Sequence, residues 1–463
     1  MKRLAEKNLE DWIRRPRRKP LIIRGARQVG KSTLVRNFAK SQRRELIEVN
    51  LERNINLDSI FKTNNVQQIL AEIEALTGVV VRDETTLLFL DEIQSTPSAL
   101  PCLRYFYEDR PNLPVIAAGS LLEFVLEKHD FSMPVGRIEY LHLGPMTFKE
   151  FLISLHEENL LAYFKEGQGD FNIPEMAHQK LLRRQREFLF VGGMPESVLA
   201  FSGSKSLLEA RAVHRSVIQT YQDDFAKYSR KTSLPRLHHV FTSLPRRIGE
   251  KVKYSQISQE DRNSDIKSAI DLLIKARLFL PAFHSDCSGL PLRAGMDEKV
   301  YKLYFLDVGL LNYLNGLDWK TIESLDERTL INEGKLAEQF TAQHLAYAEG
   351  GLEPPSLFYW LREGKTANAE VDFVVSLKDQ VVPIEIKAGK SGSLKSLQQF
   401  ALSKNTRFAC RFDLNLPSRQ TVEHHLRQRE GTKKVVFSLL SLPIYLVEEI
   451  SKVPVPRHHS SVE

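Results

Sequence analysis

Short apolar runs alternate with helical stretches over the first third of the chain. The runs that predict buried strands are Leu21–Arg24, Leu46–Leu51, Leu87–Leu90, Val115–Gly119 and Ile138–Leu143. Such short runs are typical of buried strands, and the segments between them have helical spacing. Strands that alternate with helices form mostly parallel sheets, so residues 1–155 are predicted to fold as one α/β unit.

The pattern changes twice after residue 155. From 156 to 230 the apolar spacing is helical, interrupted by the Gly-Gly-Met-Pro-Glu turn at Gly192–Glu196. Residues 231–312 predict helices followed by two strands, which is the order of a winged helix-turn-helix. Residues 313–463 predict a helix and several strands, a second α/β unit. The sequence therefore predicts a multidomain α/β protein in four parts.

Composition favours a large water-soluble protein. The chain has 463 residues, 42% of them hydrophobic and 27% charged, which is too long for one ordinary core. No apolar run approaches the roughly 18 residues of a membrane helix, and the basic N-terminus leads into no signal-peptide core. Cys102, Cys287 and Cys410 have no spacing typical of zinc sites or disulfides. We therefore expect a cytoplasmic protein that does not enter a membrane.

The net charge of +7 is unevenly distributed. Arginine and lysine crowd residues 14–19, and the third helix of the predicted winged helix carries Lys267 and Lys275. Basic clusters favour nucleic acid electrostatically, and they are also typical of an ordinary solvated surface. Winged helices contact proteins as well as DNA, so both kinds of partner stay open.

One segment has the complete pattern of a phosphate-binding loop. Gly25 and Gly30 bracket four residues and are followed by Lys31 and Ser32, which matches G-x-x-x-x-G-K-[ST]. The glycines allow backbone N–H groups to face phosphate oxygens, Lys31 supplies a cation, and Ser32 supplies a ligand for Mg²⁺. A nucleoside triphosphate with Mg²⁺ is therefore the expected cofactor. The predicted nucleotide-binding residues are Gly25, Ala26, Arg27, Gln28, Val29, Gly30, Lys31, Ser32 and Thr33.

A second segment predicts hydrolysis as well as binding. In Leu87–Gln94 (LLFLDEIQ), four apolar residues are followed by two carboxylates. Open α/β sheets place their sites at this carboxyl end of the strands. Asp91 is predicted to hold Mg²⁺, and Glu92 to accept a proton from the attacking water.

A looser pattern lies near the C-terminus. The strands Glu370–Val375 and Val381–Lys387 are predicted to form a hairpin. With a four-residue loop, the register places Asp372 opposite Glu385. Two carboxylates about 5 Å apart need a cation or a proton between them.

This hairpin leaves two interpretations open. Asp372, Glu385 and Lys387 follow the D-x12-E-x-K spacing of PD-(D/E)XK nucleases, and the helix before them carries Glu338. In such nucleases the acids hold a metal ion and the lysine activates water, so Glu338, Asp372 and Glu385 are candidate ligands of a second metal. The alternative is an inert charge ladder in which Glu370 pairs with Lys387.

Together these segments resemble a group of bacterial and archaeal AAA-type ATPases. That group joins an N-terminal ATPase core to a C-terminal domain of unknown function with a restriction-endonuclease-like fold. The matching segments are GARQVGKST (Gly25–Thr33), LDEIQ (Leu90–Gln94), GGMPE (Gly192–Glu196), DVGLL (Asp307–Leu311), EVDFVV (Glu370–Val375) and IEIKAGKSG (Ile384–Gly392). The resemblance spans nearly the whole chain, and it implies ATP as the nucleotide and a helical lid over residues 156–230.

The resemblance also implies roles for single residues. Ser120 follows the fourth strand, where AAA-type ATPases place a small polar residue that senses the γ-phosphate. Arg137 is a candidate charge-stabilising arginine, acting in its own chain or on a neighbour's nucleotide within an oligomer, and an ordinary surface arginine is the alternative. With Lys31 and Glu92 it completes the predicted catalytic set. Val371 departs from the nuclease pattern, because it stands where the family name has a proline.

Two functions of different classes follow from the sequence. In the first, an ATPase couples its nucleotide state to the binding or processing of DNA through the C-terminal domain. In the second, a nucleotide-dependent switch uses an inactive nuclease fold to dock a protein partner.

Overall fold

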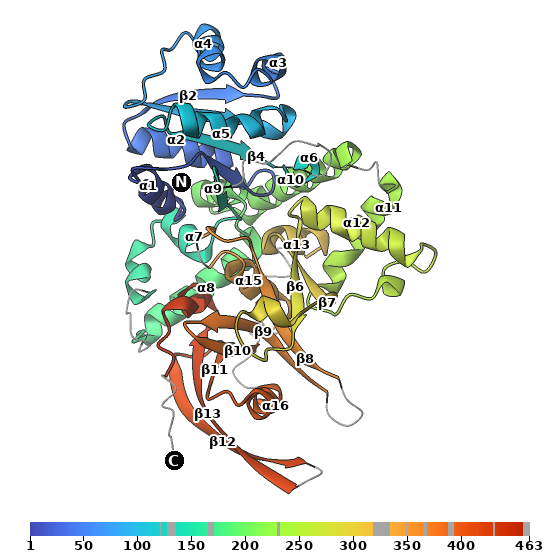
Figure 1. Ribbon diagram of the computed structural model, residues 1–463. Helices are drawn as coiled ribbons and strands as arrows, with labels where there is room; N and C mark the ends of the chain where they lie inside the picture. The colour runs from blue at the N-terminus through green and yellow to red at the C-terminus, as the bar shows by residue number, and fades with distance from the viewer. Residues whose placement is uncertain are drawn as a thin grey trace.

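Two sheets and a helical layer between them make up the molecule. The computed structural model describes residues 1–120, 122–126, 136–164, 171–228, 232–317, 334–348, 350–363, 368–387, 393–428 and 431–456. The N-terminal sheet lies at the top of Figure 1 and the second sheet at the bottom. Among the helices of these residues, none combines the length and apolarity that crossing a bilayer requires.

The N-terminal sheet is parallel, as the apolar runs predict. Its strands, in the order β2-β3-β4-β1-β5, are β1 (Leu21–Arg24), β2 (Glu45–Asn50), β3 (Thr86–Asp91), β4 (Val115–Gly119) and β5 (Glu139–His142). The predicted bounds of β1 and β4 are confirmed, and those of the other three differ by one residue at each end. Because every pair is parallel, the carboxyl ends of all these strands lie at one edge.

Helices cover both faces of this sheet because alternate strand residues point to opposite sides. Leu21 and Ile23 pack with α1 and α2 in one hydrophobic cluster, whereas Ile22 packs with α3, α4 and α5 in another. These helices are α1 (Glu6–Ile13), α2 (Lys31–Ser41), α3 (Leu57–Phe61), α4 (Val66–Thr77) and α5 (Ala99–Asp109). The short helix α6 (Leu122–Leu126) follows β4.

A helical layer follows, and three of its helices, α8 to α10, lie within residues 156–230, where the spacing predicts helices. Its main helices are α7 (Phe148–Ser154), α8 (Glu175–Val191), α9 (Pro195–Ser204) and α10 (Leu207–Tyr228). A capping box begins α7, in which the Thr147 side chain accepts from the Glu150 backbone N–H and the Glu150 carboxylate accepts from the Thr147 N–H. Aromatic packing holds α8 against α7, because the Phe188 ring packs edge-on against Phe148 and Phe151.

The second sheet contains both the predicted wing and the C-terminal strands. Its order is β12-β13-β11-β10-β9-β8-β6-β7. The strands are β6 (Phe279–Ser285), β7 (Met296–Phe305), β8 (Leu357–Arg362), β9 (Ala369–Leu377), β10 (Gln380–Ile386), β11 (Phe408–Asp413), β12 (Ser418–Gln428) and β13 (Gly431–Pro443). The helices beside it are α13 (Val308–Leu314), α15 (Gly334–Leu345) and α16 (Lys395–Lys404), and β12 and β13 extend from the body as a long hairpin (Figure 1).

The segment predicted as a winged helix has the expected order of elements but no separate wing. Helices α11 (Leu234–Ser243) and α12 (Asn263–Lys275) precede an antiparallel pair formed by β6 and β7. The edge of β6 that faces away from β7 pairs with β8, which satisfies the backbone groups of that edge. The predicted boundary at residue 312 falls within α13, and it separates strands that belong to one continuous sheet.

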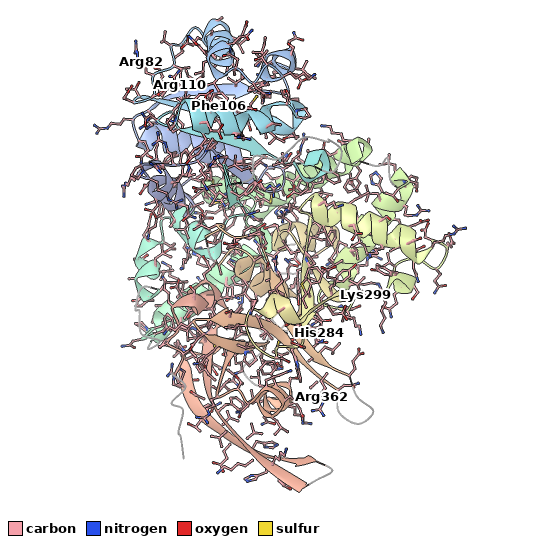
Figure 2. All side chains as sticks on the ribbon, viewed as in Figure 1. Arg82, Phe106, Arg110, His284, Lys299 and Arg362 are labelled. Carbon is pink, nitrogen blue, oxygen red and sulfur yellow. The ribbon has the colours of Figure 1, made fainter. Side chains whose placement is uncertain are left out.

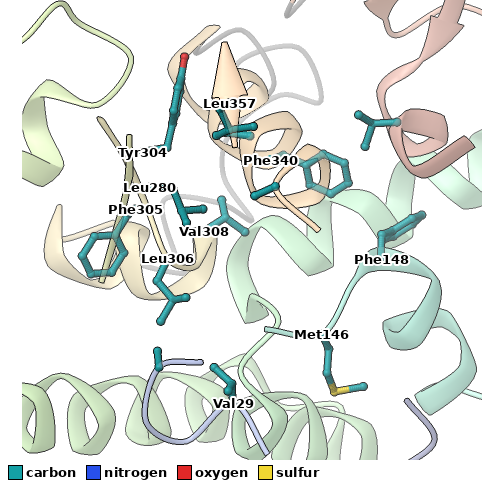
Figure 3. Close-up of a cluster of buried hydrophobic side chains, with 14 of the residues drawn as sticks. Val29, Met146, Phe148, Leu280, Tyr304, Phe305, Leu306, Val308, Phe340 and Leu357 are labelled. Carbon is teal, nitrogen blue, oxygen red and sulfur yellow. The ribbon is translucent and has the colours of Figure 1, made fainter. Parts of the chain in front are cut away.

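A single hydrophobic cluster connects the two sheets. Figure 3 shows Val29 of the phosphate-binding loop and Tyr304 of β7 within it, with Met146 and Phe148 beside the helical layer. All four side chains are buried. Since interiors this dense transmit displacement, the cluster forms a physical connection between the nucleotide-binding end and the C-terminal sheet.

Candidate nucleotide site and C-terminal acid cluster

The predicted phosphate-binding loop lies between β1 and α2 at the carboxyl edge of the first sheet. A Cβ atom on Gly25 would collide with the carbonyl oxygen of Leu143. Gly30 has a φ of +90°, a conformation that side chains disfavour. Both predicted glycines are therefore required by the loop geometry.

Lys31 is buried and points back into the loop. Its Nζ donates to the carbonyl oxygens of Gly25 and Ala26 at 3.1 and 2.8 Å. Burial lowers the pKa of Lys31 to about 8, against the raising effect of Glu92 and Asp91. The carbonyls thus hold a cation in a desolvated loop, where a phosphate would be the stronger partner.

The two predicted Mg²⁺ ligands of this site touch each other. Ser32 Oγ donates to Asp91 Oδ2 at 2.8 Å, which joins the start of α2 to the end of β3. Burial raises the pKa of Asp91. A buried carboxylate beside a hydroxyl is the oxygen ligand set that suits Mg²⁺, so these residues fit the metal.

Glu92 lies next to Asp91 in an unusual backbone conformation. Its φ is +53°, and its carboxylate accepts a hydrogen bond from Gln94 Nε2. Gln94 Oε1 and Ser120 Oγ are both buried without a protein partner. Two unpartnered polar atoms beside the end of β4 indicate room for a polar ligand or water, which agrees with the position predicted for Ser120.

Contacts that the sequence did not reveal hold the loop from two sides. Arg3 is 7% exposed and donates to the Val29 carbonyl oxygen at 2.8 Å and to Glu150 Oε2 at 3.0 Å. Arg27 pairs with Asp224 on α10 at 2.8 Å. The N-terminus and the helical layer therefore both hold the loop, and no local motif marks these partners.

Arg137 lies away from the loop. It precedes β5, whose first residue Glu139 pairs with the first residue of β1. The Arg137 side chain is 46% exposed and pairs with Glu108 on α5 at 3.1 Å. The structure does not bring Arg137 to the nucleotide edge of its own chain, because parallel strands place it at the opposite edge.

The GGMPE and DVGLL segments dock against each other. Asp307 is buried and accepts hydrogen bonds from the backbone N–H groups of Gly193 and Leu310, at 2.5 and 3.0 Å. A side chain on Gly192 would collide with the Asp307 carboxylate. Gln343 on α15 donates to the same carboxylate at 3.3 Å. These segments fasten the helical layer to the C-terminal sheet.

The predicted hairpin register near the C-terminus is confirmed, with a shorter turn. Val381 pairs with Ser376 as expected, but the loop has two residues, because Gln380 pairs with Leu377. The pairing continues to Ile384 and Phe373, so the next position places Glu385 opposite Asp372. Asp372 Oδ2 accepts a hydrogen bond from the Ile386 N–H at 2.7 Å.

Glu338 on α15 adds the third predicted acid. It accepts a hydrogen bond from the Tyr304 hydroxyl at 3.0 Å. Burial raises the pKa of Glu338, Asp372 and Glu385, and the charge of Asp372 raises the pKa of the other two further. The structure therefore brings Glu338, Asp372 and Glu385 into one electrostatic cluster.

Lys302 on β7 was not predicted, yet its charge enters this acid cluster. Its side chain is 2% exposed and pairs with Glu370. Burial would lower the pKa of Lys302, but the carboxylates of Glu338, Glu370 and Asp372 outweigh burial and raise it. The only sequence signal is a lysine among the apolar and aromatic residues at the end of β7.

Lys387 pairs with Glu385 at 2.5 Å. The charge-ladder interpretation expected Lys387 to pair with Glu370, and that pairing is wrong because Lys302 occupies Glu370. Residues 388–392 of the IEIKAGKSG segment lie outside the described residues.

The acid cluster has one feature that suits a metal ion. Glu385 Oε2 is buried without a protein partner, as expected where a ligand completes a site. Within the described ranges, no three His, Cys, Asp or Glu side chains are already gathered as a metal-binding group. Mg²⁺ commonly takes one or two carboxylates and several waters, so Asp372 and Glu385 fit as its ligands.

Family models match three parts of the chain. Residues 17–152 match an AAA domain, residues 182–321 a domain of unknown function (DUF8612), and residues 333–427 another domain of unknown function (DUF4143). The N-terminal part is therefore an AAA-type P-loop domain. No curated protein matches the chain by sequence.

Several solved structures resemble part of the chain. A Walker-type ATPase of Pyrococcus abyssi is 16% identical, with 67% of this chain and 94% of that chain covered and a TM-score of 0.42. The ORC2 protein of Aeropyrum pernix is 12% identical, with 69% and 94% covered and a TM-score of 0.37. The RuvB Holliday junction branch migration motor of Thermotoga maritima is 14% identical, with 60% and 88% covered and a TM-score of 0.29.

Proposed function

We propose that the chain is a Mg²⁺-dependent ATPase that couples its nucleotide state to DNA binding or processing by the C-terminal acid cluster. The observation that carries the ATPase assignment is the contact between Ser32 and Asp91, with Glu92 next to it. Mg²⁺ bound there would neutralise phosphate charge. Lys31 would hold the β- and γ-phosphates, and Glu92 would take the proton of the attacking water.

The helical layer supports coupling between the sites. Arg27 connects the loop to α10, and Asp307 connects the GGMPE segment to α13 and α15. Helix α15 carries Glu338 into the acid cluster. A lid movement of α8–α10 on ATP binding therefore has a continuous set of contacts through which to reach that cluster.

For the acid cluster we propose metal-dependent handling of a phosphodiester. Asp372 and Glu385 would hold Mg²⁺, and Lys387 would orient or activate water. The unpartnered Glu385 Oε2 supports this assignment. DNA remains the proposed substrate, because the basic stretch before β1 suits a polyanion.

The alternative is a nucleotide-dependent switch that docks a protein partner. Lys302 favours it, because a buried ammonium beside Glu338, Glu370 and Asp372 already supplies the charge that a metal would bring. Under this alternative the cluster is structural, and Asp372→Ala would leave every activity intact.

Two assays separate these functions. Phosphate release should require Mg²⁺ and should vanish in Lys31→Ala, which cannot bind nucleotide. Plasmid, linear and single-stranded DNA are then incubated with Mg²⁺ or Mn²⁺, with and without ATP, for wild type and Asp372→Ala. Cutting that disappears in the variant supports the nuclease, whereas intact ATPase activity without any cutting supports the switch.

A further inference from the structure

Arginines line the amino edge of the first sheet, opposite the nucleotide edge. The segments that lead into its five strands hold ten Arg or Lys and two Asp or Glu, and they are residues 14–19, 42–44, 82–85, 110–114 and 136–138. Because every strand pair is parallel, these segments lie side by side. Together they form a positively charged surface, which we call the arginine edge.

Three of these arginines pair with carboxylates at or beside the edge. The pairs, at 2.5, 3.1 and 2.7 Å, are Arg110–Asp83, Arg137–Glu108 and Arg15–Glu139. Figure 2 shows Arg110 and Arg82 on the same side of the AAA domain. These three arginines are therefore compensated within the protein.

Arg18 and Arg44 have only backbone partners among the described residues. Arg18 precedes β1, and its Nη2 donates to the carbonyl oxygen of Asn112. Arg44 precedes β2, and its Nη1 donates to the carbonyl oxygens of Thr86 and Asp83 at 3.1 and 3.5 Å. Both side chains are partly buried, and Arg18 Nε is buried without a protein partner. Each of these guanidiniums thus faces neutral carbonyls instead of a carboxylate.

The charges of Arg18 and Arg44 also oppose each other. Burial lowers the pKa of Arg18, the charge of Arg44 lowers it further, and the charge of Asp83 opposes both effects only in part. Burial lowers the pKa of Arg44 as well. Partly desolvated cations without an opposite charge are unfavourable, and bound anions would remove that cost. Phosphate groups are therefore ligands that suit this pair of arginines.

The width of the edge suits a polymer of phosphates. Arg44 reaches carbonyl oxygens at the start of β3, and Arg18 reaches Asn112 just before β4, so their guanidiniums lie over neighbouring strands. Five strands about 4.8 Å apart span about 19 Å, and Arg15 and Arg137 continue the charge toward β5. Duplex DNA carries one negative charge for about every 1.7 Å of its axis. The edge is thus long enough to face several phosphates.

The edge presents charge more than surface for stacking bases. Tyr107 on α5 is the aromatic residue beside Arg137, whose guanidinium already lies over the ring, 5.6 Å from its centroid. Single-strand sites stack bases on open aromatic rings, whereas a duplex keeps its bases inside and its phosphates outside. The arrangement therefore favours a duplex over a single strand.

We propose that the arginine edge binds the phosphate backbone of double-stranded DNA, with Arg18 and Arg44 holding adjacent phosphates. This inference rests on the proposed function, for which it names the DNA-binding surface. The contacts are to phosphates, so binding is independent of base sequence. The surface lies at the opposite ends of the strands from the nucleotide site, so DNA and ATP bind the AAA domain without competing.

Equilibrium binding of a fluorescent DNA duplex to the full chain tests the proposal, at several salt concentrations and without divalent ions. The double variant Arg18→Gln/Arg44→Gln is expected to bind about 50-fold more weakly near 0.1 M salt. The slope of log affinity against log salt should fall by about 2, because two phosphate contacts are lost. Arg18→Lys/Arg44→Lys keeps both charges and should keep most of the slope.

Two single variants are controls. Arg36→Gln removes the same charge from α2 of the same domain, where Arg36 is 54% exposed and pairs with Glu48 at 2.7 Å. Lys267→Gln removes an exposed lysine from α12, the helix that a winged helix would place in the major groove. Both should bind the duplex nearly as the wild type does. ATP hydrolysis without DNA should match the wild type in every variant, which checks that each is folded.

The outcomes are distinguishable. Wild-type affinity and slope in Arg18→Gln/Arg44→Gln would overturn the inference, as would an equal loss in Arg36→Gln or Lys267→Gln. An equal loss of slope in the lysine variant would also overturn it, because altered structure and not lost charge would then be the cause. Tighter binding of single-stranded DNA that the glutamine variant leaves unchanged would contradict the duplex assignment. Absence of DNA binding by the wild type would instead refute the DNA part of the proposed function.

Discussion

The nucleotide site and the C-terminal acid cluster are built in different ways. The first takes its phosphate and metal groups from two contiguous segments, at the ends of β1 and β3. The second combines Glu338 from α15, Asp372 from β9, Glu385 from β10 and Lys302 from β7. A site formed by two short motifs is visible in a sequence, whereas a site assembled from four elements is visible only after folding.

Charge compensation differs in the same way. At the nucleotide site Lys31 donates to two backbone carbonyls and Asp91 accepts from the Ser32 hydroxyl, so in these contacts each charged group has a neutral partner. In the acid cluster Lys302 and Lys387 already pair with carboxylates. The nucleotide site is therefore poised for ligands, while the acid cluster is partly neutralised from within.

The largest expected effect is in the nucleotide site. Glu92→Gln should keep ATP binding and lower kcat by about 10²–10⁴-fold, because the amide cannot accept the water proton. Phosphate release and equilibrium ATP binding measure the two properties separately. Glu45→Gln, an exposed acid at the start of β2, is the control and should match the wild type. Turnover at the wild-type rate in Glu92→Gln would show that the base is elsewhere.

The second effect tests the distributed construction of the acid cluster. Lys302→Met removes a cation that is 2% exposed and leaves buried carboxylates uncompensated, which should cost about 3–5 kcal/mol of unfolding free energy. Urea unfolding measures it. Lys299→Met is the control, because Lys299 is exposed on the same strand and lies at the edge of the molecule in Figure 2. Equal unfolding free energies of Lys302→Met and Lys299→Met would show that the acid cluster does not depend on β7.

The features that the sequence predicted are local, and those that it missed depend on residues distant in the sequence. The bounds of β1 and β4 and the register of Val381 with Ser376 follow from local periodicity, so they were predictable. The pairing of β6 with β8 was missed, because the order of helices and strands does not say whether a strand edge is free. Lys302 was missed because its partners lie far away in sequence, and Arg137 was favoured from sequence position alone.

A smaller effect depends on pH. Burial, followed by the charge of Asp372, raises the pKa of Glu385 to about 8 from an ordinary value near 4.5. Between pH 4.5 and pH 8 the folded state keeps this proton, whereas the unfolded state releases it. The stability that protonated Glu385 contributes is therefore fully present below pH 4.5 and is lost as pH rises through 8. Glu385→Gln should therefore gain about 2 kcal/mol relative to wild type between pH 5 and pH 8, less than the full shift implies because Lys387 pairs with the acid.

Unfolding in urea at both pH values, without divalent ions, measures this gain. Added Mn²⁺ at pH 8 should stabilise wild type and leave Glu385→Gln unchanged, since the metal binds the ionised carboxylate. A constant difference between variant and wild type across the pH range would mean that Glu385 titrates normally. The cluster would then be more solvated than its burial indicates.

The smallest expected effect asks whether the nucleotide site is as local as its motifs imply. Arg27 in the loop and Asp224 on α10 are 22% and 8% exposed and pair at 2.8 Å. Arg27→Met and Asp224→Asn should each cost about 1 kcal/mol in unfolding free energy, and the double variant little more, because one interaction is lost in all three. Fully additive costs would contradict the pairing.

Bound ATP is expected to protect α10 from proteolysis. If Arg27→Met and Asp224→Asn weaken this protection, while Arg110→Ala, which removes an ion pair with Asp83, does not, then Arg27 and Asp224 transmit the occupancy of the loop to α10. The nucleotide site would then depend, like the acid cluster, on residues that are far apart in the sequence. The two sites would differ only in how their charged groups are compensated.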